Sequence, residues 1–529
     1  MNSSPTPVKK HSIGLLRASG TVGGMTLISR VLGFVRDMVV ALLFGANAAT
    51  DAFFVAFKIP NFFRRLSAEG AFSQAFVPVF AEYRERRDDN ALRDLVSHVA
   101  GSLGALLFLV TTLGITAAPL MVLLFAPGFM DDPERYRLAS DMLRLTFPYL
   151  FFISLVALAG GILNSYQRFA VPAFTPVFLN LCLIGCAFWL GPRLDVPIMA
   201  LAWGALLAGF VQLAFQLPFL RRIGMLPRPR LSLRHEGVNK VIKLMLPAIL
   251  GSAVVQINLL IDTVIASFLI AGSVSWLFFS DRLVEFPLGV FGIAIATVIL
   301  PSLSQKHAAQ DRAAFSRNLD WGLRVSLLVA VPAAIGLILL ASPILTTLFQ
   351  YGAFTPEDTR MSAYSLVAYS IGLPGFILAK ILAPAFFARQ DTRTPVRIAI
   401  YAMLMNLVMN LGFVLLLLHF GFKGAHAGLA LATALAAWAQ TGMLWWRLRR
   451  LGVYVAQPGW FRFLLQTMLA SAVMAAALFY AAPPWSEWFG WTYVQRALWT
   501  VSLVSGGGLI YFLVLWLAGV RMAHFRGHH

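Results

Sequence analysis

The stretch SRVLGFVRDMVVALLFGANAATDAFFVAFKIPNFFRR, residues 29–65, decides the fold. It predicts two consecutive membrane-spanning helices joined by a short polar turn. A charge at the bilayer centre costs about 2.5–3.5 kcal/mol on the insertion scale, so charges persist there where they face a partner or a water-filled cavity. Basic residues outnumber acidic ones in this stretch, which predicts a cationic cavity suited to an anionic ligand. The charged residues are Arg30, Arg36, Asp37, Asp51, Lys58, Arg64 and Arg65.

The composition of the chain is typical of a membrane protein. Of its 529 residues, 59% are hydrophobic and only 12% are charged, whereas soluble domains carry about 25% charged residues. Apolar runs repeatedly reach the ~20 residues that a spanning helix needs. We therefore predict an all-α polytopic membrane protein. The two cysteines, Cys182 and Cys186, lie one helical turn apart in an apolar run and predict core packing, with no disulfide or thiolate metal site.

The spans and the basic residues together predict the topology. An even number of spans puts both termini on one side. The loops on that side hold 28 Lys and Arg residues and the opposite loops hold seven, so the positive-inside rule predicts cytoplasmic termini. The net charge of +19 thus reflects the Lys and Arg residues of the cytoplasmic loops, and it predicts no nucleic-acid partner. We expect about fourteen spans, near residues 22–46, 50–82, 94–125, 138–165, 170–191, 196–221, 238–270, 273–305, 314–348, 358–387, 394–419, 424–447, 460–482 and 494–519.

An internal repeat predicts two lobes. The segment from Pro78 (PVFAEYRERRDDNALRDLV) matches the segment from Pro301 (PSLSQKHAAQDRAAFSRNL), and QRFAVP at 167–172 matches QDTRTP at 390–395. The offset of about 223 residues spans six helices, so the halves share one topology and relate by an axis along the membrane normal. We predict an N-lobe, a basic cytoplasmic linker attracted to anionic membrane lipids, a C-lobe, and two C-terminal helices that either anchor in the membrane or guide a lipid tail. These parts are 1–222, 223–237, 238–450 and 451–529.

Charged residues within spans mark the candidate substrate site. Arginine binds phosphate bidentately and stays charged when partly desolvated, so several converging arginines predict a pyrophosphate ligand. Asp51, Lys58 and Arg65 form a heptad stripe on the second span, and Pro60 interrupts that span beside Asn61. Structural ion pairing between helices, or snorkelling of charges near span ends, is the alternative. The candidates from both lobes are Arg30, Arg36, Lys58, Asn61, Arg64, Asp281, Arg282 and Glu285, together with Asp51.

Signatures of other functions are missing from the sequence. It contains no Walker A loop and no HExxH motif, and its histidines show no ligand spacing, so we predict a transporter rather than an enzyme, with no direct ATP coupling and no cofactor. Asp262 in the seventh span could hold a coupling ion with Asn406 and Asn410 of the eleventh. Polar packing between helices is the alternative for these three residues.

Four motifs carry a resemblance to a known family. They are SRVLGFVRD (29–37), ATDAFFVAFKIPNFFRRLSAEGAFSQAFVPVFAEY (49–83), SVSWLFFSDRLVEFPLGVFGIAIATVILPSLS (273–304) and LAPAFFARQDTRTPVRIAI (382–400), and QPGW (457–460) fits too. With these motifs the chain resembles the MurJ/MviN-type lipid II flippases of the multidrug/oligosaccharidyl-lipid/polysaccharide exporter superfamily. The resemblance covers essentially the full chain.

The resemblance implies a fourteen-helix, two-lobed fold and a role in peptidoglycan biosynthesis. Lipid II, an undecaprenyl-pyrophosphate-linked precursor, would be the substrate, and cell-wall synthesis machinery a candidate partner. The protein would lie in the bacterial cytoplasmic membrane. The family's cavity positions match the arginines Arg30, Arg36, Arg64 and Arg282 and the polar residues Asp51, Ser275, Asp281 and Glu285.

The sodium site of some family members would fall at Asp262, Asn406 and Asn410, where Asn410 supplies an amide in place of a carboxylate.

The mechanism that we predict is alternating access. Pyrophosphate binds to the arginines in an inward-open cavity, and the lobes then rock to open outward. Either Na+ or the membrane potential would drive the cycle. The main alternative is an ion-coupled exporter of the same superfamily that moves another polyprenyl-linked oligosaccharide or small drugs. A cavity for cationic drugs should be rich in acids, and this one is basic.

Overall fold

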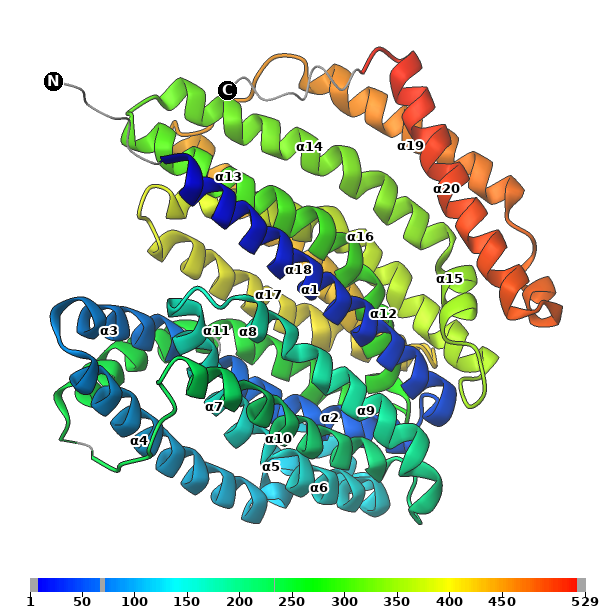
Figure 1. The fold of residues 1–529 in the computed structure, drawn as a ribbon. Coiled ribbons are helices and arrows are strands. Elements are labelled where there is room, and N and C mark those ends of the chain that lie inside the picture. Colours follow the sequence, from blue (N-terminus) through cyan, green and yellow to red (C-terminus); the bar gives the residue numbers. More distant parts are fainter. Residues whose placement is uncertain (1–7, 67–71, 233, 521–529) are drawn as a thin grey trace, which may run out of the picture. The chain divides into compact units, whose positions relative to one another are not determined.

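The computed structural model describes residues 8–66, 72–232 and 234–520. These ranges contain helices and no strand, which confirms the all-α prediction. The chain forms two compact units, Met1–Phe268 and Leu269–His529 (Figure 1). Residues 67–71 of the second family motif lie outside the described residues. The predicted boundaries of lobes and linker stay predictions.

The first unit holds eleven α-helices within the described ranges. They are α1 (Val8–Phe44), α2 (Ala48–Arg64), α3 (Ser73–Arg86), α4 (Asp89–Thr116), α5 (Ala118–Phe125), α6 (Pro133–Thr146), α7 (Tyr149–Ser165), α8 (Ala170–Phe174), α9 (Pro176–Trp189), α10 (Met199–Arg222) and α11 (Glu236–Ser267).

The second unit holds nine α-helices within the described ranges. They are α12 (Ser273–Pro287), α13 (Ile293–Ala308), α14 (Arg312–Leu339), α15 (Ala341–Leu348), α16 (Pro356–Phe387), α17 (Arg393–His419), α18 (Ala427–Arg450), α19 (Trp460–Ala481) and α20 (Tyr493–Leu517).

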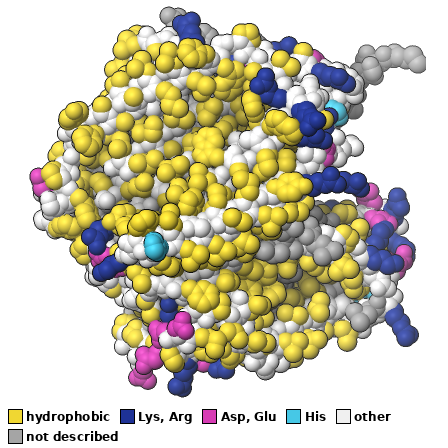
Figure 2. Space-filling view, turned by 180° about the vertical axis from the view of Figure 1, so that it is seen from behind, with side chains coloured by type: hydrophobic (Ala, Val, Ile, Leu, Met, Phe, Trp, Pro, Cys, Tyr) yellow, Lys and Arg dark blue, Asp and Glu magenta, His cyan; other side chains and the backbone are white. Residues whose placement is uncertain are grey.

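Eleven stretches of the described chain are long and apolar enough to cross a membrane. The expected spans that are not among them coincide with α1, with α2 and α3, and with α11. The count of fourteen therefore stays a prediction. Hydrophobic side chains cover most of the face seen in Figure 2, as expected for surface that contacts lipid tails.

The helix bounds reproduce the internal repeat. Helices α14 and α15 begin and end 223 residues after α4 and α5 (Asp89 to Arg312, Ala118 to Ala341). The turns after α7 and α16 are also equivalent. Gln167 and Gln390 adopt left-handed φ values of 59° and 61°, and the next residue's N–H bonds the carbonyl five residues back in both turns. This is the Schellman arrangement that ends a helix.

The linker before α11 packs on α4 inside the first unit. The Arg230 N–H donates to the Ser97 carbonyl oxygen over 3.0 Å, and the Ser102 hydroxyl donates to the Ser232 carbonyl oxygen over 3.2 Å. A Cβ atom added to Gly101 would lie 2.3 Å from the Arg230 carbonyl oxygen. Glycine at 101 therefore lets this backbone approach the helix closely.

A buried carboxylate ties the QPGW segment to α14 in the second unit. Asp320 is 3% exposed. Its Oδ1 accepts hydrogen bonds from Tyr454 Oη at 2.8 Å, Gln457 N at 3.1 Å and Trp460 Nε1 at 2.7 Å. Burial, followed by the hydrogen bond to Asp320, raises the pKa of Tyr454 above its usual value. The QPGW segment therefore holds the start of α19 against α14.

Candidate functional site

Arg36 lies on α1 and is held by two partners. Its Nε and Nη2 donate to Asp37 Oδ1 at 2.9 and 2.5 Å, and its Nη1 donates to Asn180 Oδ1 of α9 at 3.2 Å. The Asn180 Nδ2 in turn donates to the Ser29 carbonyl oxygen at 3.1 Å. The Arg36 side chain is 12% exposed and that of Asp37 1%. The guanidinium is thus desolvated and oriented, which suits a phosphate-binding group.

Arg30 differs from Arg36, although both lie on α1. Its residue is exposed, and no hydrogen bond or ion pair from its side chain occurs within the described part of the chain. An exposed and uncommitted guanidinium can contact a ligand without first losing a protein partner.

Pro60 shapes α2 next to the candidate residues. Proline has no N–H to offer to the carbonyl four residues earlier, which here belongs to Ala56. The Thr146 hydroxyl of α6 donates to this Ala56 oxygen over 2.9 Å. Beyond the proline, Asn61 Nδ2 donates to the Phe57 carbonyl oxygen at 2.8 Å and Arg64 Nε donates to Asn61 Oδ1 at 3.0 Å. The broken turn thereby orients Arg64, which is half-buried.

The three residues of the heptad stripe on α2 lie in three separate environments. Asp51 is fully buried and forms an ion pair with Arg135 of α6, with Oδ2 and Nη2 2.5 Å apart. Lys58 Nζ donates to Thr263 Oγ1 of α11 at 2.5 Å. Arg65 is exposed. Arg135 precedes the span expected at 138–165 and was therefore counted among the loop residues, but the structure places it in the first turn of α6. It is 6% exposed, and its guanidinium carbon lies 3.7 Å from the Phe129 ring centroid.

The second unit contributes one candidate arginine. Arg282 of α12 lies 2.8 Å from Glu285 through Nη1 and Oε2, and the two side chains are 32% and 48% exposed. Asp281 is exposed on the same helix. Ser275 is fully buried, near the Trp276 indole that donates to Asp358 Oδ1 of α16 over 2.9 Å. Arg282 is therefore the accessible cation of this helix, and Ser275 belongs to its packed face.

The predicted ion-site residues fall in both units. Asn410 Nδ2 donates to Asn406 Oδ1 at 3.0 Å, and Asn406 Nδ2 donates to Thr433 Oγ1 of α18 at 3.3 Å. Both asparagines are fully buried. The bond from Asn406 to Thr433 fits polar packing between α17 and α18, whereas the bond between the two asparagines lies within α17. Asp262 is half-buried on α11 of the first unit.

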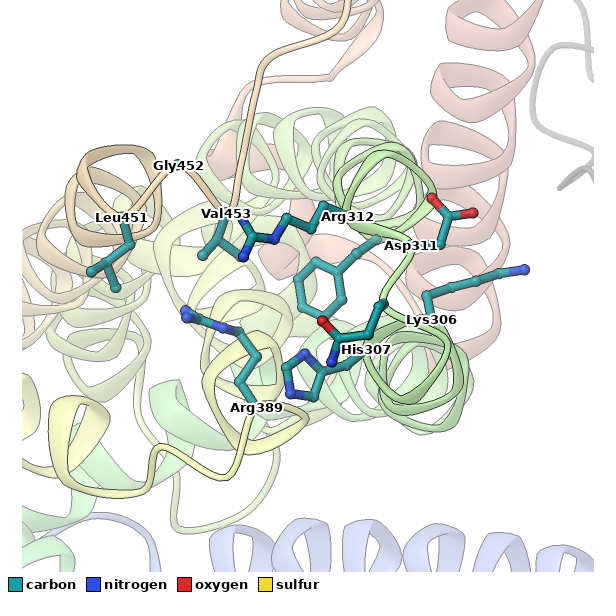
Figure 3. Close-up of a pocket in the computed structure, with 10 residues that line it drawn as sticks. Lys306, His307, Asp311, Arg312, Arg389, Leu451, Gly452 and Val453 are labelled. Carbon is teal, nitrogen blue, oxygen red and sulfur yellow. The ribbon is translucent and has the colours of Figure 1, made fainter.

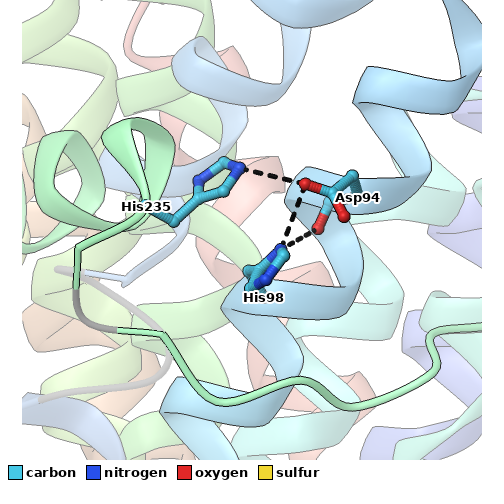
Figure 4. Close-up of side chains that lie close together, drawn as sticks. All are labelled: Asp94, His98 and His235. Carbon is cyan, nitrogen blue, oxygen red and sulfur yellow. Dashed lines mark hydrogen bonds and ion pairs between the residues drawn. The ribbon is translucent and has the colours of Figure 1, made fainter.

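A cluster that no sequence spacing revealed joins Asp94 and His98 of α4 to His235 (Figure 4). His98 Nδ1 lies 2.9 Å from the Asp94 carbonyl oxygen and 3.2 Å from Oδ2. His235 Nδ1 accepts from Gly237 N–H at 3.1 Å, so its proton sits on Nε2, 3.4 Å from Asp94 Oδ2. Both ring nitrogens that face the carboxylate are donors in this arrangement. The cluster therefore joins His235, just before α11, to α4 by hydrogen bonds and does not present a set of free metal ligands.

The partners of the candidate residues were missed by sequence reasoning. Asn180, Arg135 and Thr263 lie far along the chain from the residues that they contact. Asn180 is a single polar residue in an apolar run, and Thr263 follows Asp262 in another, which was the only signal that they gave.

Together, the fold and these side chains define a class of protein. Oriented arginines within otherwise apolar helices, on two repeated sets of spans, are typical of a membrane transporter for an anionic substrate.

The comparisons with known proteins identify the family. The sequence profile of the family described as "Lipid II flippase MurJ" matches residues 40–498. The chain belongs to this family, as its motifs indicated.

Its relatives match over nearly their full length. A probable lipid II flippase MurJ of Vibrio cholerae is 48% identical over 515 residues, which cover 96% of this chain and 97% of the relative. The lipid II flippase MurJ of Burkholderia cenocepacia is 43% identical, with coverage of 97% and 99%. A solved structure titled "Lipid II flippase MurJ, inward closed conformation" is similar with a TM-score of 0.77 at 27% identity, covering 93% of this chain and 97% of that one.

A more distant solved structure shares the fold. An inward-facing multidrug resistance MATE family transporter superposes with a TM-score of 0.63 at 16% identity, covering 82% of this chain and 98% of that one. Similarity at this level concerns the fold alone and does not extend to the substrate.

Proposed function

We propose that this chain flips lipid II from the inner to the outer leaflet of the bacterial cytoplasmic membrane, for peptidoglycan synthesis. The observation that carries this proposal is the family match over residues 40–498, supported by full-length relatives at 43–48% identity. The arginines of α1, α2 and α12 give it a chemical basis, because lipid II carries a pyrophosphate. The basic character of these candidate residues disfavours a small-drug exporter.

The arginines bind the pyrophosphate in our mechanism. Arg36 and Arg282 each hold a neighbouring carboxylate, at 2.5 Å in Asp37 and 2.8 Å in Glu285. These acids limit repulsion between cations when no substrate is bound. A pyrophosphate oxygen offers the same charge-assisted geometry and can take over a share of these donors. Arg30 adds an exposed cation without a competing acid, and Arg64 adds one whose Nε is oriented by Asn61.

Transport proceeds by alternating access, with the sugar and peptide in a polar cavity and the prenyl tail in lipid. We further propose that both termini lie in the cytoplasm, from the distribution of Lys and Arg between loops. Peptidoglycan-synthesis enzymes that use lipid II at the outer leaflet are the partners that this direction of transport implies.

Depletion of the protein from cells tests the function. We expect lipid II to accumulate in a form that an externally added lipid II hydrolase cannot cleave, because its headgroup stays in the inner leaflet. Re-expression of the wild-type chain should restore cleavage. If depletion leaves the cleaved fraction unchanged while the protein is verifiably absent, the chain does not limit lipid II flipping and an exporter of another polyprenyl-linked substrate becomes the better proposal.

The membrane potential is the energy source that we propose. A charge that crosses the full potential changes its energy by about 2.3 kcal/mol per 100 mV, so an inside-negative potential favours outward movement of an anion and inward return of the empty cationic site. In vesicles with imposed potassium gradients we expect flipping to rise with the inside-negative potential. If the flipping rate does not depend on the potential but depends on external sodium, coupling to an ion bound by Asp262, Asn406 and Asn410 becomes the better proposal.

A further inference from the structure

A cationic pocket lies at one end of the second unit, apart from the candidate substrate residues. Its volume is about 140 Å³, and it is formed where α13 ends and α14 begins, just beyond α16, and at the turn after α18. The charged or titratable residues that line it are Lys306, His307, Asp311, Arg312 and Arg389. Because it lies at helix ends, the pocket belongs to a membrane surface and not to the apolar core of the bilayer.

Arg312, which is exposed, and Arg389, which is half-buried, line this pocket. Figure 3 shows both guanidinium groups directed toward the turn at Leu451–Val453, with His307 beside Arg389, whereas Lys306 and Asp311 point away. Asp311 is committed as the cap of α14, since its carboxylate accepts from Ala314 N at 2.8 Å. The wall that a ligand would meet is therefore basic.

Neither arginine forms an ion pair in the part of the chain that the structure describes, and the Asp391 carboxylate, whose pKa Arg389 helps to lower, interacts with Arg389 only at longer range. Arg389 Nη1 is buried without a hydrogen-bond partner. Buried donors in native proteins are nearly always satisfied, so such an atom calls for an explanation. Arg312 is also the first residue of α14, where the helix dipole disfavours a cation. A bound anion would resolve both features.

The internal repeat supplies a comparison within the same chain. The positions 223 residues before His307 and Arg389 are Arg84 and Tyr166. There, the Arg84 guanidinium carbon lies 4.5 Å from the Tyr166 ring centroid, and Nη1 donates to the Ser165 carbonyl oxygen at 2.5 Å. The first unit thus fills the equivalent place with an aromatic ring and a satisfied cation.

The glycine turns after α10 and after α18 also differ in how closely a side chain covers them. Gly224 and Gly452 follow α10 and α18 with left-handed φ values of 70° and 65°. A Cβ atom on Gly224 would lie 3.2 Å from Arg93 Nη2, whereas nothing lies within 4 Å of one on Gly452. The turn is covered by a side chain in the first unit and open in the second, so the second unit alone keeps room for a ligand there.

We propose that Arg312 and Arg389 form a phosphate-binding site at the membrane surface of the second unit. Its ligand is the phosphodiester of an anionic phospholipid headgroup, and free phosphate is the other source of the same chemistry. Two guanidinium groups suit bidentate contacts with phosphate oxygens. The site is independent of lipid II transport, which is assigned to other residues.

Lipid retention by the purified full-length chain tests this site. The chain is exchanged into micelles that contain equal amounts of phosphatidylglycerol and phosphatidylcholine, and bound lipid is counted by native mass spectrometry. We expect preferential retention of phosphatidylglycerol, weakened about tenfold or more by the double variant Arg312→Gln/Arg389→Gln, since hydrogen bonds to charged groups are the strong ones. Arg317→Gln is the matched control, because Arg317 is exposed on α14 outside the pocket.

A second arm separates the two sources of phosphate. Inorganic phosphate is titrated against chloride at equal ionic strength, and the melting temperature is followed in detergent without added lipid. A phosphate-specific increase that the double variant loses, without phosphatidylglycerol preference, supports the site with a soluble ligand. Equal retention of phosphatidylglycerol by the wild type and the double variant, with no phosphate-specific stabilisation, overturns the proposal. Lipid II transport by the same variants is measured separately, so a failure of either proposal is recognised by itself.

Discussion

Replacing Arg282 by alanine is expected to reduce lipid II transport roughly 10- to 100-fold while leaving the protein folded. A hydrogen bond to a charged group contributes about 1.5–3 kcal/mol, and a loss of that size in the transport barrier gives this range of rates. The Arg282–Glu285 pair is 32% and 48% exposed, so its removal should change the free energy of unfolding by less than about 1 kcal/mol. Cleavage by external hydrolase in depleted cells that express the variant measures transport, and thermal unfolding in detergent measures stability.

Arg360→Ala is the matched control for this variant. Arg360 forms an equivalent pair with Glu357, one turn away at 2.7 Å, on α16 of the same unit, and both side chains are 50% exposed. It is not a candidate substrate residue, so its loss should leave transport unchanged. Normal transport by the Arg282 variant, or equal losses in both variants, would remove Arg282 from the site.

Arg36→Ala should show a different pattern from Arg282→Ala. Its partner Asp37 is 1% exposed, and removal of the guanidinium takes a counter-charge at 2.5 Å away from this buried carboxylate. Transport and stability should therefore fall together, which makes Arg282 the cleaner probe of substrate binding.

The helical architecture could be predicted because a bilayer admits few structures. Backbone groups in lipid must bond within their own helix, so apolar runs of sufficient length become helices. The repeat was visible for a similar reason, since the turn residues at 167 and 390 occupy the same left-handed position in each unit. Residues that end or bend helices carry local signals, and these survive in a single sequence.

The candidate arginines were predictable, and their surroundings were not. Arg36 and Arg282 stand out because charges are costly in apolar spans. The heptad spacing of Asp51, Lys58 and Arg65 predicted one shared face on a helix, yet the structure gives them three different environments through α6, α11 and solvent. Spacing along one helix determines direction only, whereas the partner depends on which other helix packs there.

Removing Arg135, as in Arg135→Met, is expected to destabilise the protein by about 3–5 kcal/mol, because it removes the guanidinium that forms an ion pair with the fully buried Asp51 carboxylate. The two groups are 5% and 0% exposed and 2.5 Å apart. Replacing both with apolar residues, as in Asp51→Val/Arg135→Met, should recover most of the loss, since buried ion pairs contribute little beyond what well-packed apolar groups provide. Thermal unfolding in detergent compares the single and double variants.

Transport by the double variant then decides the role of Asp51. Because this carboxylate is fully buried against Arg135, we expect the double variant to flip lipid II at near the wild-type rate once its stability is restored. A stable double variant that does not transport would instead assign Asp51 or Arg135 to substrate binding. Arg144→Met is the control on the same helix: its pair with Asp141 is 46% and 41% exposed, so its removal should be nearly neutral. If Arg144→Met destabilised the protein as much as Arg135→Met, the loss would come from α6 as a helix and not from its buried ion pair.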